Sequence, residues 1–296
     1  MLRVVCLVAL ARVSGGLSVA PSSQLRASTT WLEGVDVSTF GKVALRGDAG
    51  VVAETDVAAA EVMASVAADL VLSTTATAGW AGRLASAALA ARASPLAPWV
   101  GAWRGGGWAT DSADLDERDR GCKSLLATGS DNDSEIYRKF GMSCHPVVDR
   151  AALRLAALTG CGVAEARDAL LRRGAAFRAC QDGLAAQISS PAARAGLSLN
   201  ERRGVEAASF FSRAAARATW LDGRCAVVPL HDALDHAGAE GENTKLVLDG
   251  DRVLLVAARA LKRGDALTRD YLAAPSLAPK DAQPTLKLLL EHGQRS

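Results

Sequence analysis

Two of the four histidines of this chain and two aspartates lie within six residues of one another, in the stretch VVPLHDALDH at residues 227–236. Imidazole nitrogens and carboxylate oxygens are the groups that hold divalent metal ions and that move protons in catalysis. A short helical turn after the proline would place Asp232, Asp235 and His236 on one face, with His231 partly turned away. Such a face could hold a hydrated divalent ion.

The spacing weakens this metal interpretation. His231 and His236 are five residues apart, whereas the helical zinc motif of metalloproteases places its histidines four apart with a glutamate between them. No second cluster of ligands accompanies the stretch, and we predict no metal. A serine nucleophile is also disfavoured, because the chain has no GxSxG motif. The remaining local interpretation is a strand end followed by a capped turn, in which Asp232 and His236 satisfy backbone groups.

The composition indicates a globular protein that binds neither nucleic acid nor membranes. The chain has 296 residues, and its 49% hydrophobic content is enough for a large core. Its 34 basic residues nearly balance its 32 acidic residues, and the net charge of +2 gives no electrostatic reason to expect an anionic partner. The six cysteines include no CxxC pair, so we expect free and mostly buried thiols.

The first residues have the pattern of a targeting leader. A basic start is followed by an apolar run from Val4 to Ala11, too short to span a bilayer, and then by a segment rich in Ser and Thr without acids. We expect residues 1–38 to be such a leader or a disordered segment. An organelle is the expected destination, with the plastid favoured and the secretory pathway or the cytoplasm as alternatives. No later stretch reaches about eighteen uninterrupted apolar residues, so the mature protein is expected to be soluble.

The rest of the chain is predicted to form strands, then a block of helices, then strands again. Residues 42–75 carry short β-branched runs, residues 81–218 are rich in Ala, Leu and Arg, and strands return after Trp220. Asp249-Gly250 predicts a hairpin whose two central residues have positive φ. Because a small isolated sheet is marginal in water, the two sheet segments need each other, and the helices form an insertion between them. The predicted fold class is α+β, with segments at residues 39–80, 81–220 and 221–296.

Capping residues predict the ends of three helices. Asp149 can cap a helix that stops at Gly160, and the next helix is expected to run from Val163 to Arg173 and to stop at Gly174. The motif SLNE at residues 198–201 is a capping box that opens a further helix.

An ordered series of motifs in the second half of the chain changes the interpretation of VVPLHDALDH. The series runs from Ser212-Arg213 through VPLHDALDH, ALKRGD at residues 260–265 and Tyr271 to LLLEHG at residues 288–293. It resembles the series of the SET-domain protein methyltransferases, in the branch that includes the Rubisco large-subunit lysine methyltransferase. In that family the motifs are Ser-Arg, Val-Pro-Leu-x-Asp-x-x-Asn-His, Gly-Glu-Glu, Ser-Tyr-Gly and Leu-Leu-x-x-Tyr-Gly-Phe. Arg46 to Val62 also resembles the family's Gly-Arg-Gly-Leu-Val-Ala segment.

The resemblance implies a SET-type β fold of small sheets split by a long helical insertion. It also implies transfer of a methyl group from S-adenosyl-L-methionine to an amine of a protein substrate, with lysine as the favoured acceptor, histidine as a possible one, and a monomeric enzyme. Tyr271 matches the active-site tyrosine. Gly50 and the pair Asp235-His236 match positions that contact the cofactor. Ser212, Arg213 and Asp232 match positions that line the junction of cofactor and target residue.

Several residues depart from the family's pattern. Asp235 stands where the family has Asn, and an ionised carboxylate only accepts hydrogen bonds, whereas an amide also donates them. His292 replaces a closing Tyr, which predicts the loss of an aromatic wall. Further departures are Asp48, Asp265-Ala266, Leu272 and Gln294. The alternative hypothesis is therefore a catalytically silent SET-like protein that binds a partner, and a weaker one is a metal-dependent hydrolase.

Overall fold

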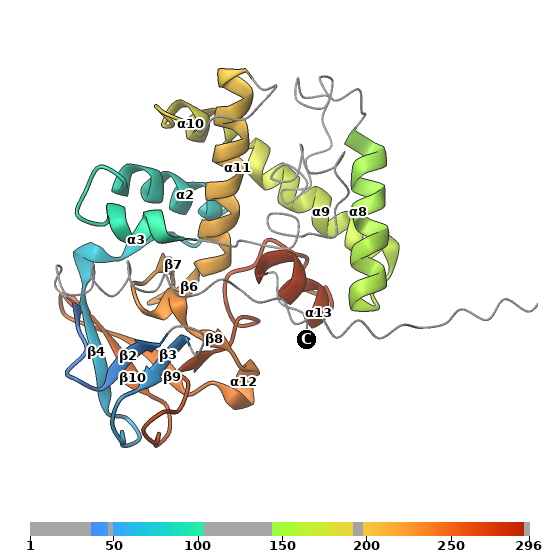
Figure 1. Cartoon of the computed structure of the whole chain (residues 1–296). Coiled ribbons are helices and arrows are strands. Elements are labelled where there is room, and N and C mark those ends of the chain that lie inside the picture. The colour runs from blue at the N-terminus through green and yellow to red at the C-terminus, as the bar shows by residue number, and fades with distance from the viewer. Residues whose placement is uncertain (1–36, 47–49, 104–143, 192–197, 293–296) are drawn as a thin grey trace, which may run out of the picture.

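The computed structural model describes residues 37–46, 50–103, 144–191 and 198–292, and its strands and helices gather in two parts (Figure 1). The strands lie in the lower part of that view and most helices lie above them. The strands are β1 (Val37–Ser38), β2 (Val43–Arg46), β3 (Gly50–Ala53), β4 (Val62–Ala67), β5 (Leu72–Thr75), β6 (Thr219–Leu221), β7 (Arg224–Val227), β8 (Asp235–His236), β9 (Thr244–Asp249), β10 (Arg252–Ala257) and β11 (Thr268–Arg269). The α-helices are α2 (Trp80–Ala91), α3 (Ala97–Ala102), α8 (Cys144–Thr159), α9 (Val163–Arg178), α10 (Gln181–Ala186), α11 (Leu199–Arg217), α12 (Gly238–Gly241) and α13 (Pro284–Lys287). Three short helical turns complete the elements: η2 (Ala68–Leu70), η3 (His231–Ala233) and η4 (Leu288–His292).

Strands from the two ends of the chain share sheets, as the sequence predicted. The largest sheet has the order β1-β4-β10-β9, and β4 from the first half pairs antiparallel with β10, with Val66 opposite Val253. A second sheet has the order β5-β7-β6, and a third consists of β2 and β3. The fold is therefore α+β, with small sheets whose strands come from both sides of the helical segment, and the prediction of this class is confirmed.

The chain segments around Val57 and Leu261 lie side by side and are joined by hydrogen bonds. Val57 and Leu261 exchange a pair of backbone hydrogen bonds, each 2.9 Å from N to O. The Asp56 carboxylate beside this pair accepts from the backbone N–H of Arg263 at 3.0 Å and from the Lys262 ammonium at 2.8 Å. The segment that carries β3 is therefore fixed against the segment that leads into β11.

Two tight turns define the hairpins of the second half. Between β9 and β10 the central residues are Gly250, with φ of 59°, and Asp251, so the turn is centred one residue later than predicted. Glycine at the first central position with positive φ is typical of a type II′ turn, in place of the predicted type I′. Asp222 and Gly223, between β6 and β7, have φ of 47° and 70° and form the turn with two positive φ values.

The helix starts and ends follow the prediction only in part. Ser198 caps α11 by a capping box in which its hydroxyl and the Glu201 carboxylate each bond the other's backbone N–H. α8 ends before Gly160 as predicted but starts at Cys144, so Asp149 lies inside it. α9 continues through Gly174 to Arg178, because Gly174 is buried where tertiary packing outweighs its weak helix propensity.

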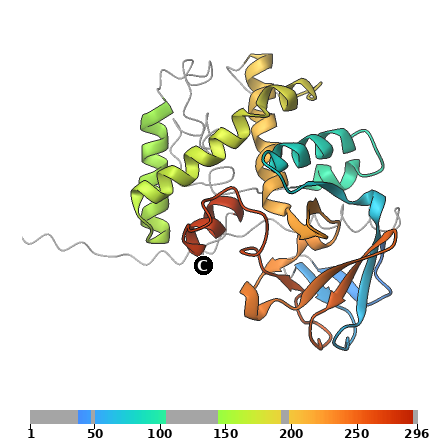
Figure 2. The ribbon, with the colours of Figure 1, turned by 180° about the vertical axis from the view of Figure 1, so that it is seen from behind.

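The core has a large helical part and a smaller sheet part. The helical part packs around fully buried side chains of α2, α8, α9 and α11, namely Leu84, Leu155, Leu170, Phe177 and Phe211. The sheet part packs around Val51, Met63, Leu234, Leu255 and Leu267. Figures 1 and 2 show α11 running from the upper helices down to β6, so its C-terminal end reaches the strands. In the described ranges we find no helix with the length and hydropathy needed to cross a bilayer.

The predicted leader up to residue 36 lies outside the described residues, as do Asp48 and Gln294. Within residues 37–38, the chain already forms β1 and pairs with β4. Between β5 and β6, the described helices run from Trp80 to Arg217, next to the predicted limits of 81 and 220.

The capping box makes Ser198 a testable stabilising residue. Ser198→Ala removes the acceptor for the Glu201 N–H and should lower the free energy of unfolding by about 1 kcal/mol. Urea denaturation followed by circular dichroism measures this change. Ser190→Ala, at an exposed serine outside any helix, is the matched control and should change stability by less than about 0.5 kcal/mol. Equal stability of the two variants would show that the cap contributes nothing.

Candidate functional site

The centre of the site is the short parallel pair of β8 and β11. Asp235 lies beside Thr268 and His236 beside Arg269 in this pair. The chain reaches β8 through a turn in which Leu230 has a φ of 71°, a conformation that costs free energy for a branched side chain and redirects the backbone after Pro229. Because Tyr271 follows β11 by two residues, the pairing brings it next to His236.

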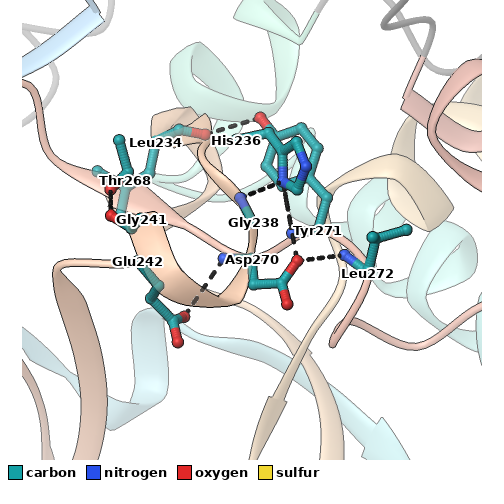
Figure 3. Close-up of polar contacts among 9 residues, drawn as sticks. All are labelled: Leu234, His236, Gly238, Gly241, Glu242, Thr268, Asp270, Tyr271 and Leu272. Carbon is teal, nitrogen blue, oxygen red and sulfur yellow. Dashed lines mark hydrogen bonds and ion pairs between the residues drawn. The ribbon is translucent and has the colours of Figure 1, made fainter. Parts of the chain in front are cut away.

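A hydrogen bond to the His236 imidazole joins His236 to Tyr271 (Figure 3). The Nδ1 atom of His236 accepts from the backbone N–H of Tyr271 at 3.1 Å and from that of Gly238 at 3.4 Å. An imidazole nitrogen that accepts N–H donors carries no proton itself, so this bonding leaves Nε2 as the nitrogen that can donate. The Asp270 carboxylate lies 3.8 Å from Nδ1 and accepts from the N–H of Leu272 at 2.8 Å.

The ring of Tyr271 packs near two imidazoles. Its centre lies 5.2 Å from that of His236 and 4.3 Å from that of His292, with an interplanar angle of 30° in both pairs. The expected loss of an aromatic wall through His292 is therefore wrong, because the imidazole itself supplies a flat ring against the tyrosine. The phenol O–H donates to the carbonyl of Leu234 at 2.7 Å.

Gly50 and Asp235 meet across the two halves of the chain. Gly50 has a φ of 64°, and a Cβ atom placed on it would lie only 3.0 Å from the Asp235 carboxylate oxygen Oδ2. A larger residue at this position would therefore be strained and would crowd that carboxylate. Asp235 is exposed as a residue, while the partial burial of its carboxyl raises its pKa. The cluster is thus open to solvent at Asp235 and half-buried at Tyr271.

Asp232 links the strand segment to two helices through a hydrogen bond and an ion pair. Its carboxylate accepts from Trp99 Nε1 on α3 at 3.1 Å and lies 3.7 Å from the Arg217 guanidinium at the end of α11. Only 6% of its side chain is exposed, and burial raises its pKa although Arg217 and Arg269 act in the opposite direction. Burial likewise lowers the pKa of Arg217 to about 10. A buried ion pair of this kind is costly to break from either side.

Arg269 is a second buried cation beside the tyrosine. Its guanidinium donates to the carbonyls of Ala218 at 3.2 Å and Ala216 at 3.5 Å, where α11 ends and leaves acceptors without helical partners. The guanidinium carbon lies 4.7 Å from the centre of the Tyr271 ring, within the range of a cation–π contact. Burial lowers the pKa of Arg269 and raises that of Tyr271, so the phenol is protonated at neutral pH.

Ser212 and Arg213 lie on α11, one turn before Arg217. Ser212 is fully buried, as its position on the helix predicts, and its hydroxyl has no hydrogen-bond partner within the described residues. The Arg213 side chain lies over the ring of Phe210 at 5.9 Å and interacts electrostatically with Arg217. The contacts thus group Gly50, Asp235, His236 and Tyr271, and they connect Asp232 to Arg217, whereas the like charges of Arg213 and Arg217 repel each other.

His231 differs from Asp235 and His236 in being a buried residue. It is buried, burial lowers its pKa well below the usual range, and its Nδ1 has no hydrogen-bond partner in the part of the chain that the structure describes. The described residues contain no group of three or more histidines, cysteines and carboxylates placed to hold a metal ion. Sequence reasoning did not find Arg217, Arg269 or Trp99. The spacing of Arg213 and Arg217 by one helical turn was the available signal for the first of these.

Comparison with known proteins finds solved structures of similar fold and no matching sequence. No family model matches the chain, and no curated protein sequence matches it. Among solved structures, the chain is similar to Rubisco LSMT bound to AdoMet, with 13% identity and a TM-score of 0.48, and to the SET domain of LSMT bound to MeLysine and AdoHcy, with 14% identity and a TM-score of 0.47. A third is Rubisco LSMT bound to sinefungin and monomethyllysine, with 13% identity and a TM-score of 0.46.

Each of these likenesses covers 93% of this chain and 57% of the other, so the chain spans little more than half the length of the structures that it matches.

The two N–H donors on His236 predict the cost of losing its imidazole. His236→Ala leaves the backbone N–H groups of Tyr271 and Gly238 without their acceptor and should lower the free energy of unfolding by about 1 to 3 kcal/mol. His236→Asn, whose side-chain oxygen takes a place close to that of Nδ1, should recover part of the loss. Urea denaturation of both variants measures the difference, and equal stability of Ala and Asn would contradict the bonding described here.

His292 predicts a pH dependence of stability. Burial lowers its pKa to about 3, with Arg269, Arg173 and His236 acting in the same direction and a hydrogen bond with the Ala216 backbone opposing them. An unfolded histidine has a pKa of about 6.5, so the unfolded chain takes up the proton first and stability is lost as the pH falls from about 6.5 toward 3.

His292→Phe keeps a ring against Tyr271 and removes this proton uptake. Its free energy of unfolding should fall less steeply than that of the wild type between about pH 6 and about pH 4, by up to about 1.4 kcal/mol per pH unit. Urea titrations across this range give the slopes. Identical slopes would mean that His292 is accessible to protons in the folded protein.

Proposed function

We propose that this protein is an S-adenosyl-L-methionine-dependent protein N-methyltransferase, with lysine as the favoured acceptor. The observation that carries the proposal is the meeting of Gly50 from the first half of the chain with Asp235, His236 and Tyr271 from the second half. These are the positions that the motif series assigns to cofactor and methyl transfer, and sequence separation alone gives no reason for them to lie together.

The residues at the open side of the cluster fit such a cofactor. Gly50 presents bare backbone where a side chain would fill the space beside Asp235. Asp235 and the Nε2 side of the His236 imidazole offer polar groups beside it. Gly50, Asp235 and His236 would hold the cofactor, which when bound supplies the methyl group as an electrophile. No metal is needed for such a displacement.

The hydrogen bonds of Tyr271 determine whether its hydroxyl can donate to a bound amine or accept from it. The Tyr271 O–H donates to the Leu234 carbonyl and its oxygen accepts from the Arg269 guanidinium, so one lone pair is left to accept from a further group. An acceptor at this point can hold one N–H of a neutral amine and leave the nitrogen lone pair directed away from it. Since burial raises the phenol pKa, Tyr271 orients the amine rather than removing its proton. The buried Arg269 guanidinium nearby disfavours a second positive charge, which favours a neutral amine.

A catalytically silent protein that binds a partner is the second candidate. The observation in its favour is Asp235, whose carboxylate lies against Gly50 where the motif series calls for an amide donor. If ionised, this group repels hydrogen-bond acceptors of a ligand and weakens binding.

Binding of S-adenosylhomocysteine separates the two candidates. Isothermal calorimetry on the full chain should detect binding, and Asp235→Asn should tighten it about tenfold because the amide restores a donor. His236→Ala should weaken it by a similar factor. Asp251→Asn, the same substitution at an exposed hairpin turn, is the matched control and should leave the affinity unchanged.

The absence of binding by the wild type and by Asp235→Asn would contradict the enzyme proposal and favour the silent protein. Binding by Asp235→Asn alone would mean that the site exists and that the native aspartate has closed it.

A further inference from the structure

Glu291 is a buried carboxylate that the proposed chemistry does not use. It lies in η4, immediately before His292, and only 4% of it is exposed. Its Oε1 atom accepts three hydrogen bonds, from the Ser276 hydroxyl at 3.0 Å and from the backbone N–H groups of Leu277 at 2.6 Å and Ala278 at 2.9 Å. A buried carboxylate is costly unless it is bonded in this way, so the three donors hold it firmly.

The three donors belong to the loop that follows Tyr271. This loop leaves β11, passes Tyr271 and reaches Ser276 five residues later. These three hydrogen bonds to Glu291, called the clamp below, therefore fix the chain on the C-terminal side of Tyr271. The parallel pair of β8 and β11 fixes the chain on the N-terminal side of Tyr271.

The same clamp also fixes the ring that lies on Tyr271. His292 is the next residue after Glu291, and its imidazole is 4.3 Å from the tyrosine ring. The fully buried Arg173 on α9 attracts the Glu291 carboxylate electrostatically, and η4 packs beside α8 and α11. Glu291 thus connects the helical part of the core to the loop that follows Tyr271 and to the imidazole that packs on the tyrosine ring.

We propose that Glu291 is a positioning residue for Tyr271: it holds the loop of residues 276–278 and, through His292, the ring that packs on the phenol. The functional meaning of this role rests on the proposed methyl transfer, in which the phenol oxygen must be placed to within a fraction of an ångström of its working position.

The test uses the tyrosine itself as the probe. The chain has two tyrosines, so Tyr137→Phe leaves Tyr271 as the single site for 3-fluorotyrosine and gives one fluorine NMR signal. In Glu291→Gln, which keeps the size but loses the charge, this signal should shift toward that of free fluorotyrosine. Ser276→Ala, which removes one of the three donors and no charge, should shift it in the same direction by a smaller amount.

Glu165→Gln is the matched control. Its carboxylate also accepts a backbone N–H of the C-terminal segment, from Gln283 at 2.8 Å, but this bond is exposed to solvent and Glu165 is far along the chain from Tyr271. This variant should leave the signal unchanged. An unchanged signal in Glu291→Gln with wild-type circular dichroism, or an equal shift in Glu165→Gln, would overturn the proposal.

Two further outcomes are covered by the design. If Glu291→Gln does not fold, Ser276→Ala decides: a shift supports the proposal, and an unchanged signal overturns it. Calorimetry with S-adenosylhomocysteine on the wild type tests the proposed function separately, because a protein that binds no cofactor can still show the shift. A failed positioning role and a failed function are thus distinguishable.

Discussion

The site depends on the parallel pairing of two strands of two residues each, β8 and β11. A parallel pair requires a crossover, and here the chain between them makes α12, the hairpin of β9 and β10, and the corner at Leu261 before it returns. This return places the Tyr271 backbone N–H against His236 Nδ1. Such a short pair has little stability of its own, so its geometry relies on the sheets around it and on the hydrogen bonds of the imidazole.

Buried polar links connect this pair to the helices. The Asp232 carboxylate reaches Trp99 on α3 and Arg217 on α11, and Arg269 satisfies carbonyls at the end of α11. Hydrophobic packing alone is tolerant of small shifts, whereas a buried charge with fixed partners accepts only one arrangement. We therefore expect the helical segment to fix the position of β8 and β11 as well as to cover them. Glu291 extends the same principle to the last described turn.

The sequence was sufficient for features that depend on local rules and insufficient for those set by distant contacts. The capping box at Ser198, the hairpin at Gly250 and the pairing of sheet segments from both ends follow from propensity and pattern, although the turn is displaced by one residue. α9 runs through Gly174 because packing outweighs an intrinsic preference. The partners of Asp232 lie on α3 and α11, more than a hundred residues and fifteen residues away respectively, and no spacing rule links them. His292 was read by residue type as a lost aromatic wall, and only its contact with Tyr271 shows that an imidazole can serve there.

We propose that Gly50, Asp235 and His236 form one side of a cofactor site whose other side is Tyr271. The decisive measurement is a crystal structure of the chain with S-adenosylhomocysteine. Density for the ligand is expected against the Gly50 backbone and within hydrogen-bond distance of Asp235 or His236. A groove of about 600 Å³ lies on the largest sheet, and Phe40, Lys42, Val62 and Arg252 are among the residues that line it. Ligand density in that groove, with Gly50 and Asp235 free of ligand, would show that the cofactor binds elsewhere.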